Sequence, residues 1–270
     1  MRIAFIGGGN MASALIGGLI ARGTRRSAIC VIEPLPAARR RLAARFKVHT
    51  SAAPDARTLA ADTVVLAVKP QDMRAAAAPL AGKLGARLVI SVAAGIRLKD
   101  LVRWLGGHAK LIRCMPNTPA LIGAGIAGLY APPGIKAAER RRAESILNAV
   151  GKVVWVKDEA LLDPVTAVSA SGPAYVFWFI EQLAQSAQAL GLAPEVATEL
   201  ALETVLGSAK LAAGSREPPA VLRERVTSKG GTTAAALRVF EEEGLAERFM
   251  RAVAAASRRG TEMGDELGRD

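Results

Sequence analysis

Residues 3–12 have the sequence IAFIGGGNMA, and this stretch decides the fold of the 270-residue chain. Its four apolar residues predict a buried strand, and a GxGxxA pattern follows directly before a predicted helix. In this pattern Gly7 permits a tight turn, Gly9 lets a pyrophosphate approach the backbone, and Ala12 lets the helix pack closely on the strand. The N–H groups at the start of the helix then face the phosphates. We therefore predict a dinucleotide-binding loop made by Gly7, Gly9, Asn10, Met11 and Ala12.

Short apolar runs alternate with helical patterns through the first 160 residues. The run at 63–68 is apolar on both faces, as in parallel strands that helices cover on both sides. This alternation predicts an α/β fold with a Rossmann-like, doubly wound sheet. The expected strands lie at 2–6, 28–32, 63–68, 87–92, 111–114 and 152–156, with helices at 10–22 and up to residue 46.

The strand patterns stop near residue 160, and the remaining sequence is helical in pattern. We therefore expect a dinucleotide-binding domain over residues 1–160 and an all-α domain over residues 161–270. The first helix of the second domain contains Pro173 and is apolar nearly all round at 177–180, which favours burial against a core or another subunit. Glycine and proline breaks predict helices at 164–190, 194–213, 218–226, 231–242 and 244–264.

Composition and charge weigh against several classes of protein. The hydrophobic fraction of 51% does not fit a disordered chain, and the first residues do not have the pattern of a signal peptide. No apolar stretch reaches the ~20 residues of a membrane span, so we expect no membrane association. The net charge is +12, but the basic residues are scattered. We expect them to favour anionic small molecules, not nucleic acid.

Cysteines and histidines are few. Cys30 and Cys114 stand far apart and outside any metal-like spacing, so we expect two reduced, buried thiols and a cytoplasmic protein. His49 and His108 have no partners at metal-ligand spacing, and we expect no metal site and no catalytic histidine.

Further coenzyme contacts are expected where later strands end. Glu33 follows the second strand, where an acidic residue commonly binds the adenosine ribose diol and favours NAD(H). The arginines at 39–41 lie in the next helix and point instead to a 2′-phosphate, so the preference between NADPH and NADH stays open. Lys69 is expected to donate to the nicotinamide ribose. The small residues after the third and fourth strands complete the expected set, which is Ala67, Val68, Lys69, Pro70, Ala93 and Ala94.

Three more motifs, together with the glycine loop and residues 67–70, resemble the pyrroline-5-carboxylate reductase family along essentially the whole chain. They are RCMPNTP at 113–119, SASGPAY at 169–175 and VTSKGGTT at 226–233. The resemblance implies an oxidoreductase that makes L-proline by hydride transfer to Δ1-pyrroline-5-carboxylate. It implies NADP(H) as coenzyme with NAD(H) as the alternative. It also implies a homodimer through the helical domain, and larger rings of dimers.

The resemblance also assigns roles to individual residues. Thr233 matches the position whose hydroxyl meets the imine nitrogen, and Asn117 is expected to line the nicotinamide pocket. The residues implied to bind the substrate are Ser171, Ser228, Gly230, Gly231 and Thr232. The chain departs from the family at Lys229, where a proline is usual, and at Ala170, where a glycine is usual. Lys229 puts substrate affinity in question.

Other functions remain as alternatives to this reading. A β-hydroxyacid dehydrogenase would carry a catalytic lysine on the long helix, but no lysine occurs between Asp163 and Leu192. A reductase of another cyclic imine shares the same architecture. A non-catalytic dinucleotide-binding paralogue, with Lys229 spoiling the substrate loop, is the alternative from a different class.

Overall fold

The computed structural model describes residues 1–269 and divides into two compact units. The first unit contains Met1–Ser171 together with the residues from Ala255 on, and the second is Gly172–Ala254. This division differs from the boundary expected near residue 160. Residues 159–171 belong to the first unit because their polar groups bond to its sheet, and the chain returns to that unit at its end.

Eight strands form one sheet in the order β3-β2-β1-β4-β5-β6-β7-β8, and all neighbouring pairs are parallel except β6 and β7. The six expected strands are confirmed. The patterns missed β3, which has only three residues, and β7, whose two glycines lower its strand propensity. The strands are β1 (Ile3–Ile6), β2 (Ile29–Ile32), β3 (His49–Ser51), β4 (Thr63–Leu66), β5 (Leu88–Ser91), β6 (Leu111–Met115), β7 (Gly125–Tyr130) and β8 (Gly151–Trp155).

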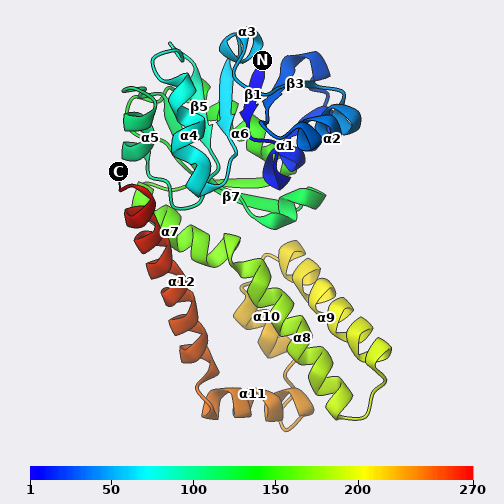
Figure 1. Ribbon diagram of the computed structural model, residues 1–270. Helices are drawn as coiled ribbons and strands as arrows, with labels where there is room; N and C mark the ends of the chain where they lie inside the picture. The colour runs from blue at the N-terminus through cyan, green and yellow to red at the C-terminus, as the bar shows by residue number, and fades with distance from the viewer. Residues whose placement is uncertain (270) are drawn as a thin grey trace. The chain divides into compact units, whose positions relative to one another are not determined.

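Two hydrophobic cores lie on opposite faces of this sheet. Along β1, Ile3 and Phe5 enter one core while Ala4 and Ile6 enter the other, because successive side chains of a strand point to opposite faces. The first core is covered by α1 (Asn10–Ala21), α2 (Pro36–Phe46) and α6 (Ala137–Leu147), and the second by α4 (Met73–Ala77) and α5 (Leu98–Trp104). Helices on both faces confirm the doubly wound α/β arrangement (Figure 1).

Helices make up the second unit, as the sequence predicts. Its elements are α8 (Gly172–Ala189), α9 (Pro194–Gly214), α10 (Pro219–Arg225), α11 (Thr232–Glu242) and the first turns of α12 (Leu245–Leu267). The expected helix over 164–190 is not continuous. It is divided into α7 (Leu162–Val165), a π-helical turn (Thr166–Ala170) and α8. None of the helices in residues 1–269 combines the length and apolar character of a membrane span.

The short helix α3 (Ala56–Leu59) is held by a charged cap. The Asp55 carboxylate accepts a hydrogen bond from the Thr58 N–H at 2.9 Å and lies 2.7 Å from Nε2 of His49 on β3. Partial burial on its own would raise the pKa of Asp55, but the hydrogen bonds from Thr58 and His49 outweigh it and lower this pKa to about 2. The charged form of Asp55 is therefore the form that stabilises the fold.

We expect Asp55→Ala to lower the free energy of unfolding by about 1 kcal/mol at pH 7, which is the usual cost of losing an N-cap. The folded-state pKa lies below the unfolded value of about 3.9, so the charge-dependent stabilisation is fully present above pH ~4 and is lost as the pH falls toward 2. Urea unfolding at pH 7 and pH 3, at one protein concentration, measures both effects. Asp55→Asn, which keeps an acceptor oxygen, should retain most of the cap; equal losses in the two variants would contradict the assignment.

Candidate functional site

The glycine loop after β1 lies against the end of β4. Gly7 has a backbone φ of +96°, and a Cβ placed there would lie 2.8 Å from the carbonyl oxygen of Ala67 and 2.8 Å from the Val68 side chain. Both the positive φ and the lack of space require glycine at this position. The loop is thereby pressed onto the strand end that the sequence predicts to contact the coenzyme.

The N-terminus of α1 opens beside this loop. Its N-cap is Gly9, a Cβ on Gly9 would meet no atom within 4 Å, and within residues 1–269 no side chain caps the helix. The first helical hydrogen bond runs from Ser13 N–H to the Gly9 carbonyl. The N–H groups of Asn10, Met11 and Ala12 precede it and so have no partner within the helix; Asn10 is exposed and Met11 partly exposed, so the start of α1 suits a pyrophosphate.

Glu33 binds the glycine loop directly. One carboxylate oxygen accepts the Gly8 N–H and the other accepts the Leu35 N–H, both at 3.0 Å. Arg39 does not pair with this carboxylate; its Nη1 donates to the carbonyls of Glu33 and Pro34 at 2.7 and 2.6 Å. The structure therefore places the Glu33 carboxylate and the Arg39 guanidinium side by side where β2 ends, without a bond between them.

The ends of β4 and β5 are neighbours of the glycine loop, since β1, β4 and β5 are adjacent parallel strands. Lys69 is exposed, while Ala93 is buried and Ala94 partly buried. Carboxyl ends of parallel strands meet at one edge of the sheet. The structure thus brings together twelve of the predicted coenzyme residues, namely Gly7, Gly9, Asn10, Met11, Ala12, Glu33, Ala67, Val68, Lys69, Pro70, Ala93 and Ala94.

Asn117, the thirteenth, is buried and already bonded at both ends of its amide. Its Nδ2 donates to the Ser169 carbonyl at 3.1 Å, and its Oδ1 accepts the Ile126 N–H at 2.9 Å. Pro173 stands four residues after Ser169 and has no N–H to offer that carbonyl. Asn117 supplies the missing donor, so its observed role is to hold the π-helical turn, and its contact with nicotinamide stays a prediction.

The π-helical turn leads into Ser171, after which the chain enters the second unit. The Ser171 N–H donates to the Thr166 carbonyl at 2.9 Å, which closes the wide turn. Pro173 then occupies the second position of α8, where a missing N–H is tolerated. The irregular turn thus lies just before Pro173 in the chain.

Arg113 begins the RCMPNTP motif, and the sequence alone predicts no role for it. Its side chain is only 5% exposed, and it pairs with Glu159 at 3.1 Å and Asp163 at 3.8 Å. Glu159 also accepts the Leu98 N–H at 2.8 Å. A charged residue in an apolar strand signals such carboxylate partners, but the sequence does not say which ones.

The predicted substrate loop lies in the second unit, before α11. Gly231 N–H donates to the Ser228 carbonyl at 3.0 Å, and a Cβ on Gly231 would collide with Ser228 Oγ. Gly230 has a φ of +71°, so the loop is a tight turn that requires glycine at position 230. Lys229 is exposed, and no side chain in the described part of the chain caps α11. Thr232 and Thr233 form the first turn of that helix, Thr233 being the less exposed.

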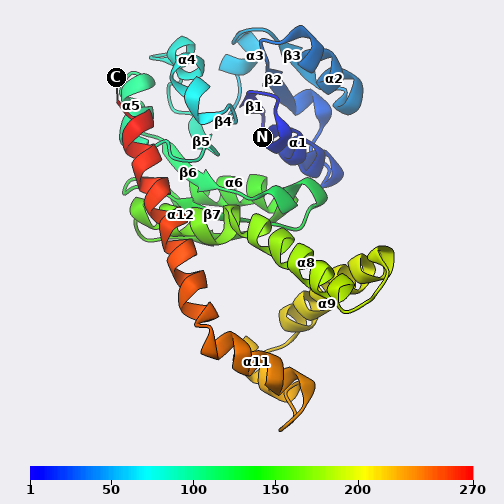
Figure 2. The same cartoon turned by 60° about the horizontal axis from the view of Figure 1, so that its bottom comes forward.

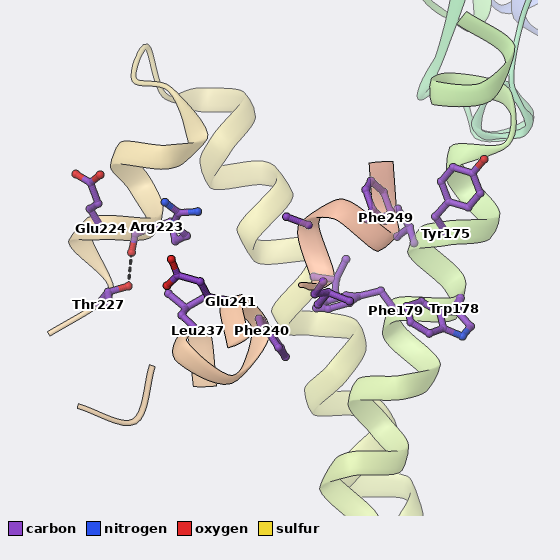
Figure 3. Close-up of a pocket in the computed structure, with 14 residues that line it drawn as sticks. Tyr175, Trp178, Phe179, Arg223, Glu224, Thr227, Leu237, Phe240, Glu241 and Phe249 are labelled. Atoms are coloured by element: carbon purple, nitrogen blue, oxygen red, sulfur yellow. Dashed lines mark hydrogen bonds between the residues drawn. The ribbon is translucent and has the colours of Figure 1, made fainter. Parts of the chain in front are cut away.

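A cavity of about 880 Å³ lies among the helices of the second unit. Figure 3 shows Tyr175, Trp178 and Phe179 along α8, with Tyr175 beside Phe249; these two rings meet edge to face at 6.1 Å. In Gly172–Ala254 only three residues are buried, and all are alanines: Ala184, Ala197 and Ala201. This unit has wide apolar faces and no core of large side chains of its own.

The remaining titratable groups agree with the sequence reading. Burial raises the pKa of Cys30 to about 11 and raises that of Cys114 further, and both cysteines are free and buried, which confirms the expected thiols. Across residues 1–269, His, Cys, Asp and Glu do not gather in groups of three that could hold a metal ion. The expected absence of a metal stays a prediction.

Comparison with family models gives two matched regions, and the second along the chain begins close to the boundary that the sequence predicts near residue 160. The family model described as "Pyrroline-5-carboxylate reductase dimerisation" matches residues 159–263, and the one described as "NADP oxidoreductase coenzyme F420-dependent" matches residues 2–95. A pyrroline-5-carboxylate reductase from Pseudomonas aeruginosa is 44% identical over 99% of this chain and 98% of its own.

Solved structures give the same result. A pyrroline-5-carboxylate reductase from Coxiella burnetii has a TM-score of 0.92 at 40% identity, covering 97% of this chain and 98% of its own. A pyrroline carboxylate reductase from Plasmodium falciparum, solved with NADP bound, has a TM-score of 0.85 at 28% identity and covers 98% of both chains. The resemblance carried by the motifs is confirmed. The chain is an oxidoreductase that belongs to the pyrroline-5-carboxylate reductase family.

Proposed function

We propose that this chain reduces Δ1-pyrroline-5-carboxylate to L-proline, the last step of proline biosynthesis. One observation carries the proposal: a chain that is 44% identical to a pyrroline-5-carboxylate reductase over 99% of its length also keeps the open glycine loop at the start of α1. The geometry of the glycine loop before α1 gives no support to the alternative of a non-catalytic paralogue.

The coenzyme would be held at the carboxyl edge of the sheet. The N–H groups of Asn10, Met11 and Ala12 would bind the pyrophosphate, and the small strand ends at Ala67 and Ala93 leave room for the nicotinamide half. When bound, this coenzyme supplies the hydride that reduces the C=N bond. Lys69 is exposed and is proposed to donate to the nicotinamide ribose.

The substrate loop would bind the carboxylate and the ring nitrogen. The backbone of Gly230 and Gly231 forms a tight turn before an uncapped helix, an arrangement that suits an anion. We propose that this turn binds the substrate carboxylate together with Ser228 and Thr232. We propose that Ser171 also binds the substrate. The Thr233 hydroxyl would hold the ring nitrogen. A protonated imine is already electrophilic, so these residues act by positioning and electrostatics.

We expect Thr233→Ala to lower kcat/KM for Δ1-pyrroline-5-carboxylate by about 10- to 100-fold, because one hydrogen bond to the reacting group is lost. Steady-state oxidation of NADPH by purified protein measures it. Thr233→Ser keeps the hydroxyl and should stay within a few fold of the wild type. A wild-type protein with no turnover with either coenzyme would contradict the proposed reaction. Full activity in Thr233→Ala would contradict only the role assigned to Thr233.

For the coenzyme we propose NADP(H) as the main form and NAD(H) as a second one. The arginines of α2 favour a 2′-phosphate, and the Plasmodium falciparum relative was solved with NADP bound. Glu33 opposes this choice, because its carboxylate is held by Gly8 and Leu35 and is not neutralised by Arg39. The balance between NADPH and NADH therefore depends on one charge.

Removing that charge should shift the coenzyme preference. We expect Glu33→Gln to raise the ratio of kcat/KM for NADPH over NADH about tenfold, because a like charge no longer faces the 2′-phosphate. The ratio is measured with both coenzymes at one ionic strength. Glu195→Gln on α9 removes one negative charge from the helical unit and should leave the ratio unchanged. An unchanged ratio in Glu33→Gln would show that this carboxylate does not face the adenosine ribose.

We also propose that the helical unit forms a homodimer with a second copy. Phe177 and Trp178 on α8 are 65% and 56% exposed, and burying such a side chain contributes about 1.5–3 kcal/mol. The matched family model is described as a dimerisation region. Larger rings of dimers, the cytoplasmic location, and the lack of nucleic-acid and membrane partners stay predictions.

We expect Phe177→Glu to convert the dimer to monomers, because a charge on this face cannot be buried without a partner. Sedimentation velocity at micromolar concentration resolves the two species. Gln188→Glu adds the same charge at an exposed polar position of α8 and should leave the dimer intact. A Phe177→Glu variant that sediments as the wild type would place the interface elsewhere.

A further inference from the structure

The end of α12 packs on the loop that follows β5. Both Figure 1 and Figure 2 show the last turns of α12 beside α5, although these elements are far apart in the sequence. Both belong to the first unit. Gly264 is buried at this contact, and Leu267 is packed against the core on that face of the sheet. A helix that begins in the second unit therefore ends on the sheet unit.

Two glycines meet where the helix touches the loop. A Cβ on Gly264 would lie 3.1 Å from the Gly95 carbonyl oxygen and 2.9 Å from Nε of Arg97. Gly95 has a φ of +74°, and a Cβ there would lie 3.5 Å from Cβ of Met263. The helix and loop backbones thus approach so closely that a methyl group at Gly264 would force one of them to move.

Polar bonds fasten the same contact. Arg97 Nη2 donates to the Thr261 carbonyl at 3.1 Å, and Arg97 Nη1 pairs with Asp265 at 2.8 Å. One helical turn further on, Arg103 donates to the Gly268 carbonyl at 2.7 Å. Gly268 follows the last helical residue, so its carbonyl has no partner within the helix and Arg103 supplies one, whereas Arg97 adds a bond to a carbonyl inside the last turns.

The loop held in this way carries Ala93 and Ala94, which lie at the carboxyl edge of the sheet beside the end of β4. We propose that the last turns of α12 position this loop for the coenzyme, with Gly264 and Arg97 as positioning residues that set coenzyme affinity without touching it. This inference rests on the proposed function. Small displacements of a binding loop weaken binding because the loop must then be reordered around its ligand.

The test compares two glycines one turn apart on α12. A Cβ on Gly260 would make only ordinary contacts, the nearest at 3.6 Å to Asp163, so Gly260→Ala is the matched control for Gly264→Ala. Coenzyme fluorescence, titrated without substrate, gives the Kd for NADPH; steady-state rates give the KM for Δ1-pyrroline-5-carboxylate. We expect Gly264→Ala to raise the Kd about tenfold while that KM stays within about twofold, and Gly260→Ala to change neither.

Arg97→Gln removes the bonds from Arg97 to Thr261 and Asp265 without adding a bulky group. This variant tests the same inference if Gly264→Ala does not fold. We expect it to raise the coenzyme Kd about threefold at a temperature where thermal unfolding shows the variant to be folded; a merely structural change would leave the Kd unaltered there. Wild-type Kd values in folded Gly264→Ala, or in Arg97→Gln, would overturn the inference while leaving the proposed reaction intact. A wild-type protein that binds neither NADPH nor NADH would contradict the proposed function, and this inference with it.

Discussion

The backbone of Gly7 approaches the end of β4 so closely that no side chain fits between them. This contact fixes the turn between β1 and α1 at the centre of the sheet, where the strand order changes direction. It sets the N-terminus of α1 beside the ends of β4 and β5, and the twelve residues that we predict to bind the coenzyme lie around it. A larger residue at position 7 would displace both strand ends at once, so the proposed coenzyme site depends on this one close approach.

Buried polar groups join the sheet to the segment that leaves it. Arg113 pairs with Glu159 and Asp163, and Asn117 bonds to Ser169. These bonds satisfy groups that would be costly to bury alone, since an unpaired buried polar group costs about 1–3 kcal/mol. Arg113 and Asn117 of the motif at 113–119 therefore act as buried residues that bond to other parts of the chain. It fixes the π-helical turn from which α8 starts, and thereby the place of Ser171.

The helical unit differs from the sheet unit in how it is stabilised. The sheet unit has two cores of large apolar side chains, whereas the helical unit buries only alanines and leaves five aromatic side chains exposed, namely Phe177, Trp178, Phe179, Phe240 and Phe249. Its stability as proposed comes from a second copy, so folding of the substrate loop and assembly would be linked by mass action. The end of α12 has a different role, because it is anchored to the sheet unit through Arg97 and Arg103.

The sequence by itself determined the α/β class, six of the eight strands, the helical second half and the glycine loop, because strand periodicity and glycine spacing are local features. It missed β7, whose glycines give no strand pattern. It placed a boundary near residue 160 that the packing moves to Ser171. Only the tertiary structure decided that the amide of Asn117 is used inside the protein and that α12 holds the Gly95 loop. Asn117 and Ser169 are 52 positions apart, and Arg97 and Thr261 are 164 positions apart. No local pattern encodes which distant group will satisfy a buried donor or fill the space beside a glycine.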